Sequence, residues 1–324
     1  MAPQTLFARF PEHDTHPLHV LTHRLYEAQQ RQWPMLQDGV EALKNVRVRT
    51  VDCNGFSVRL QFNPKRIVST GAKVDAAAIR ERKCFLCSAH LPAEQQGILV
   101  REKFLILCNP MPIFPEHFTI AHVDHIPQSI EESILTFLTM AKELSPRYSV
   151  FYNGPKCGAS APDHLHFQAS PFGAIPAEKE LPSYLRQMKE SGGVTVSSAE
   201  GYGRSVLVLS GNGEQQMELA FLRLTSAMRR VTGTNDEPMM NVLGSYADGR
   251  WTVTVFLRSK HRPDVYFREG EEKVLISPAS VDIGGLVVTP MEKDFLRADS
   301  SMIESIFHEI SIPQDAVQRI VEAL

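Results

Sequence analysis

The sequence predicts an α+β fold on an antiparallel or mixed sheet. Three features indicate this: predicted strands follow one another through short turns, a few helices separate them, and one strand–helix–strand–strand order occurs twice. Strands joined by tight turns pair antiparallel, whereas a doubly wound chain alternates strand and helix throughout. The chain contains neither a G-x-G-x-x-G nor a P-loop motif, which also argues against a doubly wound α/β fold.

The first predicted element is a long helix between about residues 17 and 43. Apolar residues recur there at helical spacing, at Leu18, Leu21, Leu25, Trp33 and Leu36. Asp14 or Thr15 can cap this helix, and Pro17 suits its first turn because a nitrogen at that position needs no hydrogen-bond partner.

Strands dominate the chain from the end of this helix to about residue 170. Asn54-Gly55 is a strong turn signal between two strand-like runs, and it predicts a hairpin of Val46–Val51 and Phe56–Phe62. The next predicted elements are strands at Phe104–Leu107 and Phe118–His122, a helix at Gln128–Leu144, a strand at Tyr148–Tyr152 and a strand starting at His164.

The segment 171–201 is richer in Pro, Glu, Ser and Gly than its surroundings, and it predicts a connection with one short helix. Beyond it the earlier order recurs, with a strand at Ser205–Leu209, a helix at Gln215–Val231, and strands at Met239–Leu243 and Trp251–Leu257. We therefore expect an N-terminal half at 1–172 and a C-terminal half at 173–324.

The two halves can be matched on Asn153 and Asn241, each expected near the end of the strand after a long helix. His164 and His166 follow Asn153 by eleven and thirteen residues, and Thr252 and Thr254 follow Asn241 by the same offsets. This indicates an internal duplication in which only the first copy kept reactive groups. The alternative is a coincidence between two ordinary strand–helix–strand–strand units.

Composition limits the classes of function. The 324 residues are 43% hydrophobic and 22% charged, as in a soluble globular protein. A net charge of −3 without a long basic run argues against a nucleic-acid binder. The chain shows no signal-peptide pattern and no apolar run long enough for a membrane span. Five cysteines do not form a secreted disulfide pattern, so we expect a cytoplasmic protein.

The most informative stretch is the run from His164 to Gln168. Side chains alternate between the two faces of a strand, so His164, His166 and Gln168 are expected on one face, with Leu165 and Phe167 in a core on the other. A loop with glycine, serine and lysine precedes the run and suits anion binding. A single strand histidine is more often structural, but the combined pattern favours phosphate chemistry.

Cys84-x-x-Cys87 is compatible with a metal knuckle, a redox pair or no special role. Tetrahedral zinc needs two further N or S ligands, for which His125 and His164 are the leading candidates. His90, His117 and His122 are the reserves. A redox pair normally opens a helix after a strand, and this segment lacks that context, which favours structural zinc.

At this point the residues resemble the histidine-triad (HIT-like) superfamily, specifically its nucleotidyltransferase branch. That branch includes galactose-1-phosphate uridylyltransferase, diadenosine tetraphosphate phosphorylase and the GDP-hexose phosphorylases. Its H-x-H-x-Q motif stands here as His164-Leu-His166-Phe-Gln168, and the resemblance is specific over about 80–170. The local string looks like the GDP-hexose phosphorylases and the zinc residues look like the uridylyltransferases, which indicates a separate bacterial family within the branch.

The resemblance implies an antiparallel HIT-like sheet with helices, arranged as two degenerate HIT-like halves. It also implies that His166 is the nucleophile that forms a covalent nucleotidyl-histidine, with Gln168 contacting a phosphoryl oxygen. Covalent catalysis of this kind gives ping-pong kinetics. The implied partners are a nucleotide-sugar or dinucleoside polyphosphate and a phosphate or sugar-phosphate acceptor, for a monomer or homodimer.

Other polar residues are candidates for substrate binding. Asn153 is expected to orient the phosphate or ribose, and either Ser160 or Lys156 to hold the phosphate, because three residues rather than two separate Ser160 from His164. The remaining candidates are cations in two loops, namely Lys65, Arg66, Arg258 and Lys260 with the adjoining His261 and Arg262. Two other classes of function remain open: a nucleotide sensor or scaffold without turnover, and a HIT-like or zinc-dependent nucleotide hydrolase.

Overall fold

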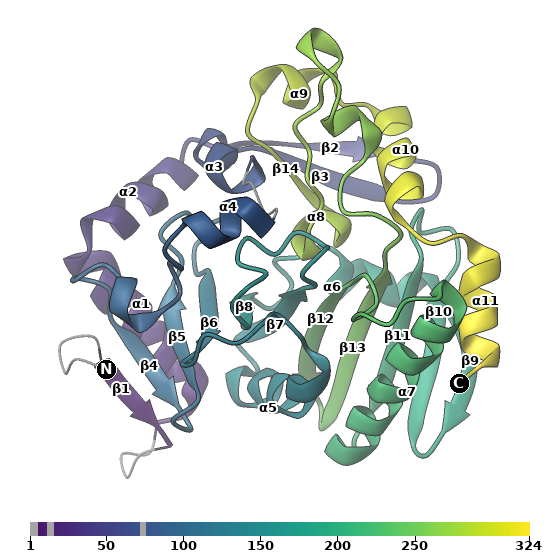
Figure 1. Cartoon of the computed structure of the whole chain (residues 1–324), viewed down its shortest axis with the longest axis horizontal. Helices are drawn as coiled ribbons and strands as arrows, with labels where there is room; N and C mark the ends of the chain where they lie inside the picture. The colour runs from purple at the N-terminus through teal and green to yellow at the C-terminus, as the bar shows by residue number, and fades with distance from the viewer. Residues whose placement is uncertain (1–5, 12–15, 72–75) are drawn as a thin grey trace.

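The computed structural model describes residues 6–11, 16–71 and 76–324, and two sheets form its framework (Figure 1). The strands are β1 (Leu6–Phe10), β2 (Arg47–Asp52), β3 (Ser57–Phe62), β4 (Gly97–Val100), β5 (Phe104–Cys108), β6 (Phe118–His122), β7 (Tyr148–Asn153), β8 (His166–Pro171), β9 (Leu185–Ser191), β10 (Val194–Ala199), β11 (Val206–Gly211), β12 (Met240–Ala247), β13 (Arg250–Leu257) and β14 (Leu286–Thr289). The large sheet has the order β1-β4-β5-β6-β8-β7-β12-β13-β11-β10-β9, and the small sheet has the order β14-β3-β2.

The sheets are mixed, because β1–β4 and β14–β3 pair in parallel and the other pairs are antiparallel. The α-helices are α1 (Leu18–Gln32), α2 (Pro34–Leu43), α3 (Ile67–Thr70), α4 (Ala76–Glu81), α5 (Ile134–Leu144), α6 (Ala177–Glu180), α7 (Glu214–Thr232), α8 (Ser280–Ile283), α9 (Glu292–Arg297), α10 (Ser300–Ile310) and α11 (Gln314–Glu322). The predicted α+β class is therefore correct.

The expected helix between about 17 and 43 is two helices, α1 and α2. They meet at Trp33, whose backbone is extended with φ −113° and ψ 104°. Pro34 causes the break, because its ring excludes the helical conformation from the preceding residue and it has no N–H to donate. Pro17 precedes the first helical residue, whereas the proposed caps Asp14 and Thr15 lie outside the described residues.

Several predicted strands are confirmed within one or two residues, including the hairpin of β2 and β3 around Asn54-Gly55. The segment 171–201 was expected to be a connection with one short helix; the short helix is present as α6, but the expected absence of strands is wrong. It contains α6 and a complete hairpin, β9 and β10, whose turn is Gly192-Gly193 with φ +59° and +78°. Most of β9 is exposed at the sheet edge, so it lacks the apolar alternation that marks a half-buried strand.

Apart from β1, which adds a strand at one edge, the strand order of the large sheet is symmetric about the β7–β12 pair. Outward on one side come β7, β8, β6, β5 and β4, and outward on the other come β12, β13, β11, β10 and β9. Helix α5 lies between β6 and β7 in the chain, and α7 lies between β11 and β12. We call β4–β8 the first strand set and β9–β13 the second strand set. Two HIT-like halves would repeat the same order of strands and helix in this way, as the sequence predicted.

The residue match used to predict the duplication is wrong. Asn153 is the last residue of β7, but Asn241 is the second residue of β12, and the two are cross-strand partners rather than equivalent positions. The predicted strand Met239–Leu243 ends four residues before β12 does, which is why Asn241 was expected near a strand end.

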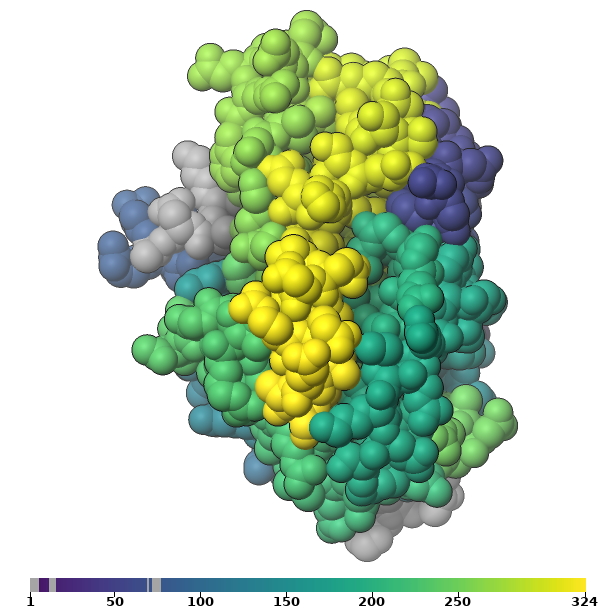
Figure 2. All heavy atoms as spheres, turned by 90° about the vertical axis from the view of Figure 1, so that its right-hand side faces the viewer, coloured from purple at the N-terminus to yellow at the C-terminus, as the bar shows by residue number. Residues whose placement is uncertain are grey.

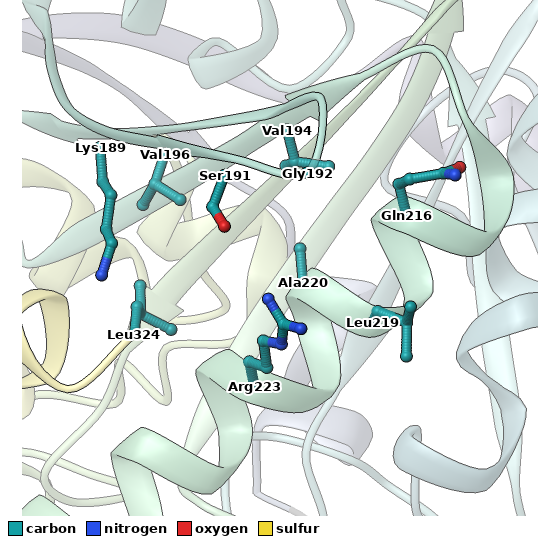
Figure 3. A pocket seen from close by; sticks show the side chains of 10 residues that line it. All are labelled: Lys189, Ser191, Gly192, Val194, Val196, Gln216, Leu219, Ala220, Arg223 and Leu324. Carbon is teal, nitrogen blue, oxygen red and sulfur yellow. The ribbon is translucent and has the colours of Figure 1, made fainter.

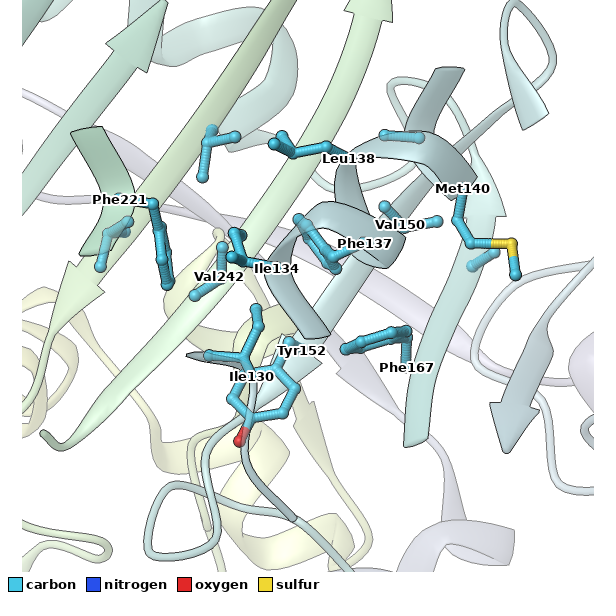
Figure 4. Close-up of a cluster of buried hydrophobic side chains, with 14 of the residues drawn as sticks. Ile130, Ile134, Phe137, Leu138, Met140, Val150, Tyr152, Phe167, Phe221 and Val242 are labelled. Carbon is cyan, nitrogen blue, oxygen red and sulfur yellow. The ribbon is translucent and has the colours of Figure 1, made fainter. Parts of the chain in front are cut away.

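Two apolar cores cover the two faces of the large sheet. Side chains of α1, α5, α7 and α11 pack on one face, and Figure 4 shows Phe137 of α5 near Phe167 of β8, with Ile134 of α5 on the side toward Phe221 of α7. The small sheet with α8, α9 and α10 packs on the other face. Helices α10 and α11 run as a band along one side of the molecule (Figure 2). Among the described residues no helix is long and apolar enough to cross a membrane.

Candidate active site

Strand β8 lies in the middle of the large sheet and sorts its side chains between the two faces. Phe167 enters the core under α5, as the alternation predicted, while His166 and Gln168 face the side of the small sheet and line a cavity. The strand begins at His166 rather than at His164. His164 lies in the preceding turn, where its backbone N–H donates to Ala161 O at 3.1 Å.

The turn brings His164 to the cysteine pair. The ligand atoms of Cys84, Cys87, His125 and His164 all lie within 4.8 Å of one another. Cys84 Sγ is 3.3 Å from His164 Nδ1, and Cys87 Sγ is 3.3 Å from His125 Nδ1. Burial raises the pKa of Cys84, but hydrogen bonds with His164 and the nearby backbone bring it down to about 6. These four side chains therefore form a site that could bind a metal ion.

The chemistry of the four ligands fits zinc. Both imidazoles turn Nδ1 toward the cysteines and Nε2 toward an oxygen outside the cluster. His164 Nε2 is 2.8 Å from His122 O, and His125 Nε2 is 3.6 Å from Asp163 Oδ2. Metal-binding histidines usually make such an outer contact, which fixes the tautomer that leaves the other nitrogen free to bind. Three reserve candidates, His90, His117 and His122, lie outside the cluster.

His166 is held as a neutral imidazole. Its Nδ1 is 2.8 Å from the carbonyl oxygen of His164, which can only accept, so Nδ1 carries the proton and Nε2 has the free lone pair. Burial lowers the pKa of His166 to about 4. Gln128 fixes its backbone, because the Gln128 side chain accepts from His166 N at 2.8 Å and donates to His166 O at 3.0 Å.

Asn153 is oriented by residues of the second strand set and of α8. Its Oδ1 accepts from Asn241 Nδ2 at 2.9 Å and from the backbone N–H of Ser280 at 2.8 Å. The single hydroxyl proton of Ser280 is shared between Asn153 Oδ1 and Tyr152 O, each 2.7 Å from Ser280 Oγ. A backbone N–H can only donate, so the accepting atom is the oxygen. Asn153 Nδ2 has no hydrogen-bond partner among the described residues, and Asn153 lines the same cavity as His166.

Gln168 contacts His117, with 2.9 Å between Gln168 Oε1 and His117 Nε2. His117 is 2% exposed, and burial together with the nearby charge of Arg66 lowers its pKa to about 3. Its Nδ1 is 3.3 Å from the backbone nitrogen of Ile113. No acceptor for Gln168 Nε2 is found in the part of the chain that the structure describes.

The cavity beside these residues has a volume of about 610 Å³. One part of its wall is apolar, with Phe85, Leu86, Leu91 and Met111, and another part is cationic, with Arg66 and Arg262. Arg82 also lines it and donates to Asp163, the residue next to His164, at 2.5 Å. The cavity wall and the metal cluster therefore share a contact at Asp163.

The structure separates the predicted substrate-binding cations. Arg66 and Ser160 line the cavity, whereas Lys65 and Lys156 do not, and Lys156 pairs with Asp236 at the surface at 2.6 Å. Lys260 is paired with Asp264 and Glu309.

Arg258 is buried away from the cavity. Its guanidinium donates to the Asn241 side chain and to the carbonyl groups of Pro278, Lys260 and His261.

Sequence reasoning missed two residues of the site. Gln128 and His117 touch the His strand directly, but their partners lie 38 and 51 residues away in the chain. No local pattern could reveal these contacts. For His117 the only available signal was a histidine directly before a predicted strand, and it was considered solely as a reserve metal ligand.

Figure 3 shows a different, smaller hollow, which none of the candidate active-site residues line. It has a volume of about 90 Å³ and lies between the β9–β10 hairpin and α7. The side chains of Lys189 and Arg223 border it, together with Leu324. It therefore adds nothing to the candidate site around His166.

Comparisons with known proteins agree with this architecture. Residues 25–171 match a family model described as a domain of unknown function (DUF4922). No curated protein sequence matches the chain. Among solved structures, yeast Ap4A phosphorylase Apa2 in complex with Ap4A is similar, with a TM-score of 0.60 and 16% sequence identity over 92% of this chain and 98% of that chain.

The chain has a HIT-like fold. The similarity to the yeast phosphorylase extends over both strand sets, since it covers 92% of the chain. A DUF4931 family protein from Bacillus cereus matches 56% of this chain and 93% of its own, with a TM-score of 0.36 and 13% identity.

Proposed function

We propose that the protein is a nucleotidyltransferase or phosphorylase that acts on a nucleotide-sugar or dinucleoside polyphosphate through a covalent nucleotidyl-His166 intermediate. The observation that carries this proposal is the state of His166. Its Nδ1 is bound to a backbone carbonyl, it is buried and neutral, and it lines a cavity of about 610 Å³ with Gln168 and Asn153. A neutral imidazole with a fixed tautomer is a good nucleophile near pH 7.

In the first step His166 Nε2 attacks the α-phosphorus of the nucleotide. A P–N bond forms, and the P–O bond to the leaving phosphate or phosphorylated group breaks, so that this group departs as an anion. In the second step a phosphate oxygen of the acceptor attacks the same phosphorus, the P–N bond breaks, and neutral His166 is restored. The Nδ1–H bond to His164 O stabilises the positive charge that develops on the ring in between.

Two amide groups and a hydroxyl are candidates to hold the phosphoryl oxygens. Asn153 and Gln168 present NH₂ groups, and Ser160 lines the same cavity. None of these groups supplies a proton to the leaving group near neutral pH. This favours leaving groups that are stable anions, such as sugar phosphates or nucleoside polyphosphates, over alcohols. Arg66 and Arg262 add positive charge to the wall where such an anion would lie.

Zinc fits the Cys84, Cys87, His125 and His164 cluster, and we propose that it has a structural role there. When bound, it would tie the cysteine loop and the His125 loop to the turn before β8. Four protein ligands leave no open position on a tetrahedral ion, which argues against zinc-dependent hydrolysis as the main activity. His164, as a ligand, would fix the backbone carbonyl that orients the His166 ring.

The test is a search for the covalent intermediate. The protein is incubated with nucleotide-sugars and dinucleoside polyphosphates, quenched in base and examined by mass spectrometry; the expected result is one nucleoside monophosphate per chain, located on His166. The variant His166→Ala should stay folded, form no adduct, and lose turnover by several orders of magnitude. Reversible binding without an adduct would instead identify a nucleotide sensor, and metal-dependent release without an adduct a hydrolase.

A further inference from the structure

His117 contacts the candidate active site but has no role in the reaction as proposed above. It lies directly before β6, is 2% exposed, and packs its ring against Phe114 and Phe151 at centroid distances of 5.7 and 5.9 Å. Both of its ring nitrogens have a polar neighbour, namely Ile113 N and Gln168 Oε1. A histidine that only filled space would not need two such contacts.

The contact with Ile113 determines the direction of the hydrogen bond between His117 and Gln168. The backbone N–H of Ile113 can only donate, so His117 Nδ1 accepts and carries no proton. A neutral imidazole then has its proton on Nε2, which donates to Gln168. The atom that receives this bond must be the amide oxygen, and the NH₂ group of Gln168 is left to face the cavity.

We propose that His117 is a positioning residue that fixes the side-chain amide of Gln168 so that its NH₂ group, and not its oxygen, faces the phosphoryl group being transferred. The proposal rests on the nucleotidyl transfer proposed above. An amide that could rotate by half a turn would present its oxygen to the phosphoryl oxygens in part of the molecules, and the partial negative charge of the amide oxygen is repelled by the anionic phosphoryl oxygens. A fixed orientation removes this loss and requires no rearrangement during the reaction.

Burial and a nearby cation keep His117 in the required form. Burial lowers its pKa to about 3, with a further lowering by Arg66. The ring therefore stays neutral at physiological pH and cannot act as an acid toward the leaving group. Protonation would also place a second proton on Nδ1, opposite the N–H of Ile113. Its contribution is thus restricted to the orientation of Gln168.

Asn153 shows the same arrangement by different means. Its oxygen accepts from the Asn241 side chain and from the backbone N–H of Ser280, and its NH₂ group is left without a partner among the described residues of the cavity wall. Both amides beside His166 thus have their oxygens bound by protein donors. Because two separate amides are fixed in the same orientation, with oxygen toward the protein and NH₂ toward the cavity, both are expected to donate hydrogen bonds to the phosphoryl oxygens.

A double-mutant cycle tests whether His117 acts through Gln168. His117→Phe keeps a ring of similar size and removes both nitrogens, so the rate of nucleotidyl transfer should fall about 10- to 100-fold. In a Gln168→Ala background the same change should alter the rate by less than about threefold, because the group that it positions is gone. His117→Gln, which places an NH₂ group near the position of Nε2, should recover part of the rate. Equal losses in both backgrounds would overturn the proposal.

The tautomer of His117 can be measured without any substrate. In protein labelled with ¹⁵N-histidine, the His117 resonances, assigned by comparison with His117→Gln, should show a proton on Nε2 and none on Nδ1. A proton on Nδ1 would overturn the proposal, because Gln168 would then be free to turn. The adduct experiment and the tautomer measurement test the two hypotheses separately. A wild-type protein that forms no adduct refutes nucleotidyl transfer, while a proton on Nδ1 refutes only the role of His117.

Discussion

Three side chains of the candidate site owe their orientation to backbone groups with a single hydrogen-bonding role. The carbonyl of His164 can only accept and fixes the proton of His166 on Nδ1, while the N–H of Ile113 fixes that of His117 on Nε2. The backbone N–H of Ser280 can only donate, so the atom of the Asn153 amide that faces it must be the oxygen. Because backbone positions are set by the fold, the donor and acceptor pattern of the cavity follows from the fold as well.

The identity of residue 168 should decide the balance between transfer and hydrolysis. An imidazole at this position can protonate a poorer leaving group, so we expect Gln168→His to raise the ratio of free nucleoside monophosphate to transferred nucleotide. The measurement is the product distribution with phosphate or a sugar phosphate as acceptor. Thr119→His is a matched control, since Thr119 lies opposite Gln168 in the sheet and also lines the cavity.

The ratio should stay near the wild-type value in the control. A wild-type protein that already hydrolyses faster than it transfers, with every plausible acceptor, would contradict this prediction. So would a Gln168→His variant with lower total rate and an unchanged product ratio, because the added imidazole would then have no part in proton transfer.

His117 should also make stability depend on pH. Burial lowers its folded-state pKa from 6.5 to about 3, so between these values the unfolded chain binds more protons than the folded chain. The contribution of neutral, buried His117 to the free energy of unfolding is fully present above pH 6.5. As the pH falls from 6.5 toward 3, the free energy of unfolding decreases by up to about 1.4 kcal/mol per pH unit. Urea unfolding between pH 7 and 5 should show a steeper loss for the wild type than for His117→Gln. Parallel curves would contradict the neutral, buried state of His117.

At the scale of residues, local periodicity predicted one side of the site. The alternation from His164 to Gln168 correctly placed Phe167 in the core and His166 with Gln168 on the opposite face. The start of the strand was wrong by two residues, because His164 turns out of the sheet toward the cysteines. Contacts made over long sequence distances, such as Gln128 to His166, depend on the folded topology and have no local signature.

At the scale of elements, the four cysteine and histidine side chains of the candidate metal site come from three separate segments. Cys84 and Cys87 follow α4, His125 follows β6, and His164 precedes β8. Without a metal the cysteine segment is joined to the turn before β8 by the Arg82–Asp163 ion pair and by weak sulfur–nitrogen contacts, such as the 3.6 Å between Cys87 Sγ and His164 Nδ1. The His125 segment is joined to that turn by backbone hydrogen bonds such as Leu165 N–H to Ile126 O at 2.7 Å. The free energy of binding zinc would therefore also stabilise the turn that orients His166.

We expect one zinc ion per chain, measured by elemental analysis of metal-replete protein. Cys84→Ser should reduce the zinc content to well below half an equivalent and lower the melting temperature, while Cys53→Ser, which replaces a free cysteine outside the cluster, serves as the control and should change neither. Chelation of the wild type should lower adduct formation together with stability. A fully active, metal-free protein of unchanged melting temperature would contradict a structural zinc site.

Element prediction succeeded where one face of a strand is buried. The predicted strand Phe118–His122 is β6 with the same bounds, and its alternation is clear because it lies in the middle of the sheet. The edge strand β9 escaped prediction because exposed polar residues occupy both of its faces. The break between α1 and α2 was missed because the prediction followed the helical spacing of apolar residues, which continues across Pro34.

At the scale of the whole molecule, the candidate site lies at the junction of the two strand sets. Asn153 of β7 meets Asn241 of β12, and Ser280 of α8 completes the contact. The sequence predicted a repeated order of elements, but it could not show that β7 and β12 would pair and merge the two sets into one sheet. The division of the chain at residues 172 and 173 remains a prediction.

Arg258 holds this junction together from within. It follows β13, is 2% exposed, and donates to the Asn241 side chain as well as to Pro278 O at 3.0 Å, His261 O at 2.8 Å and Lys260 O at 3.1 Å. It was predicted to contact substrate phosphates, but it does not line the cavity, and both of its terminal NH₂ groups donate to the framework. Its effect on the cavity is transmitted through Asn241, which donates to the oxygen of Asn153.

Arg258→Met should therefore destabilise the protein and weaken catalysis together. The change leaves buried oxygens without donors, and we expect a loss of roughly 2–4 kcal/mol in the free energy of unfolding, even though a buried cation is removed. Adduct formation should fall about tenfold, since the cost of a misplaced Asn153 amide is comparable to the loss of a weak donor. Lys260→Met is the matched control, because Lys260 makes only surface ion pairs, which contribute about 0–1 kcal/mol. If Lys260→Met lowered the adduct yield as much as Arg258→Met at unchanged stability, the basic cluster would contact substrate after all.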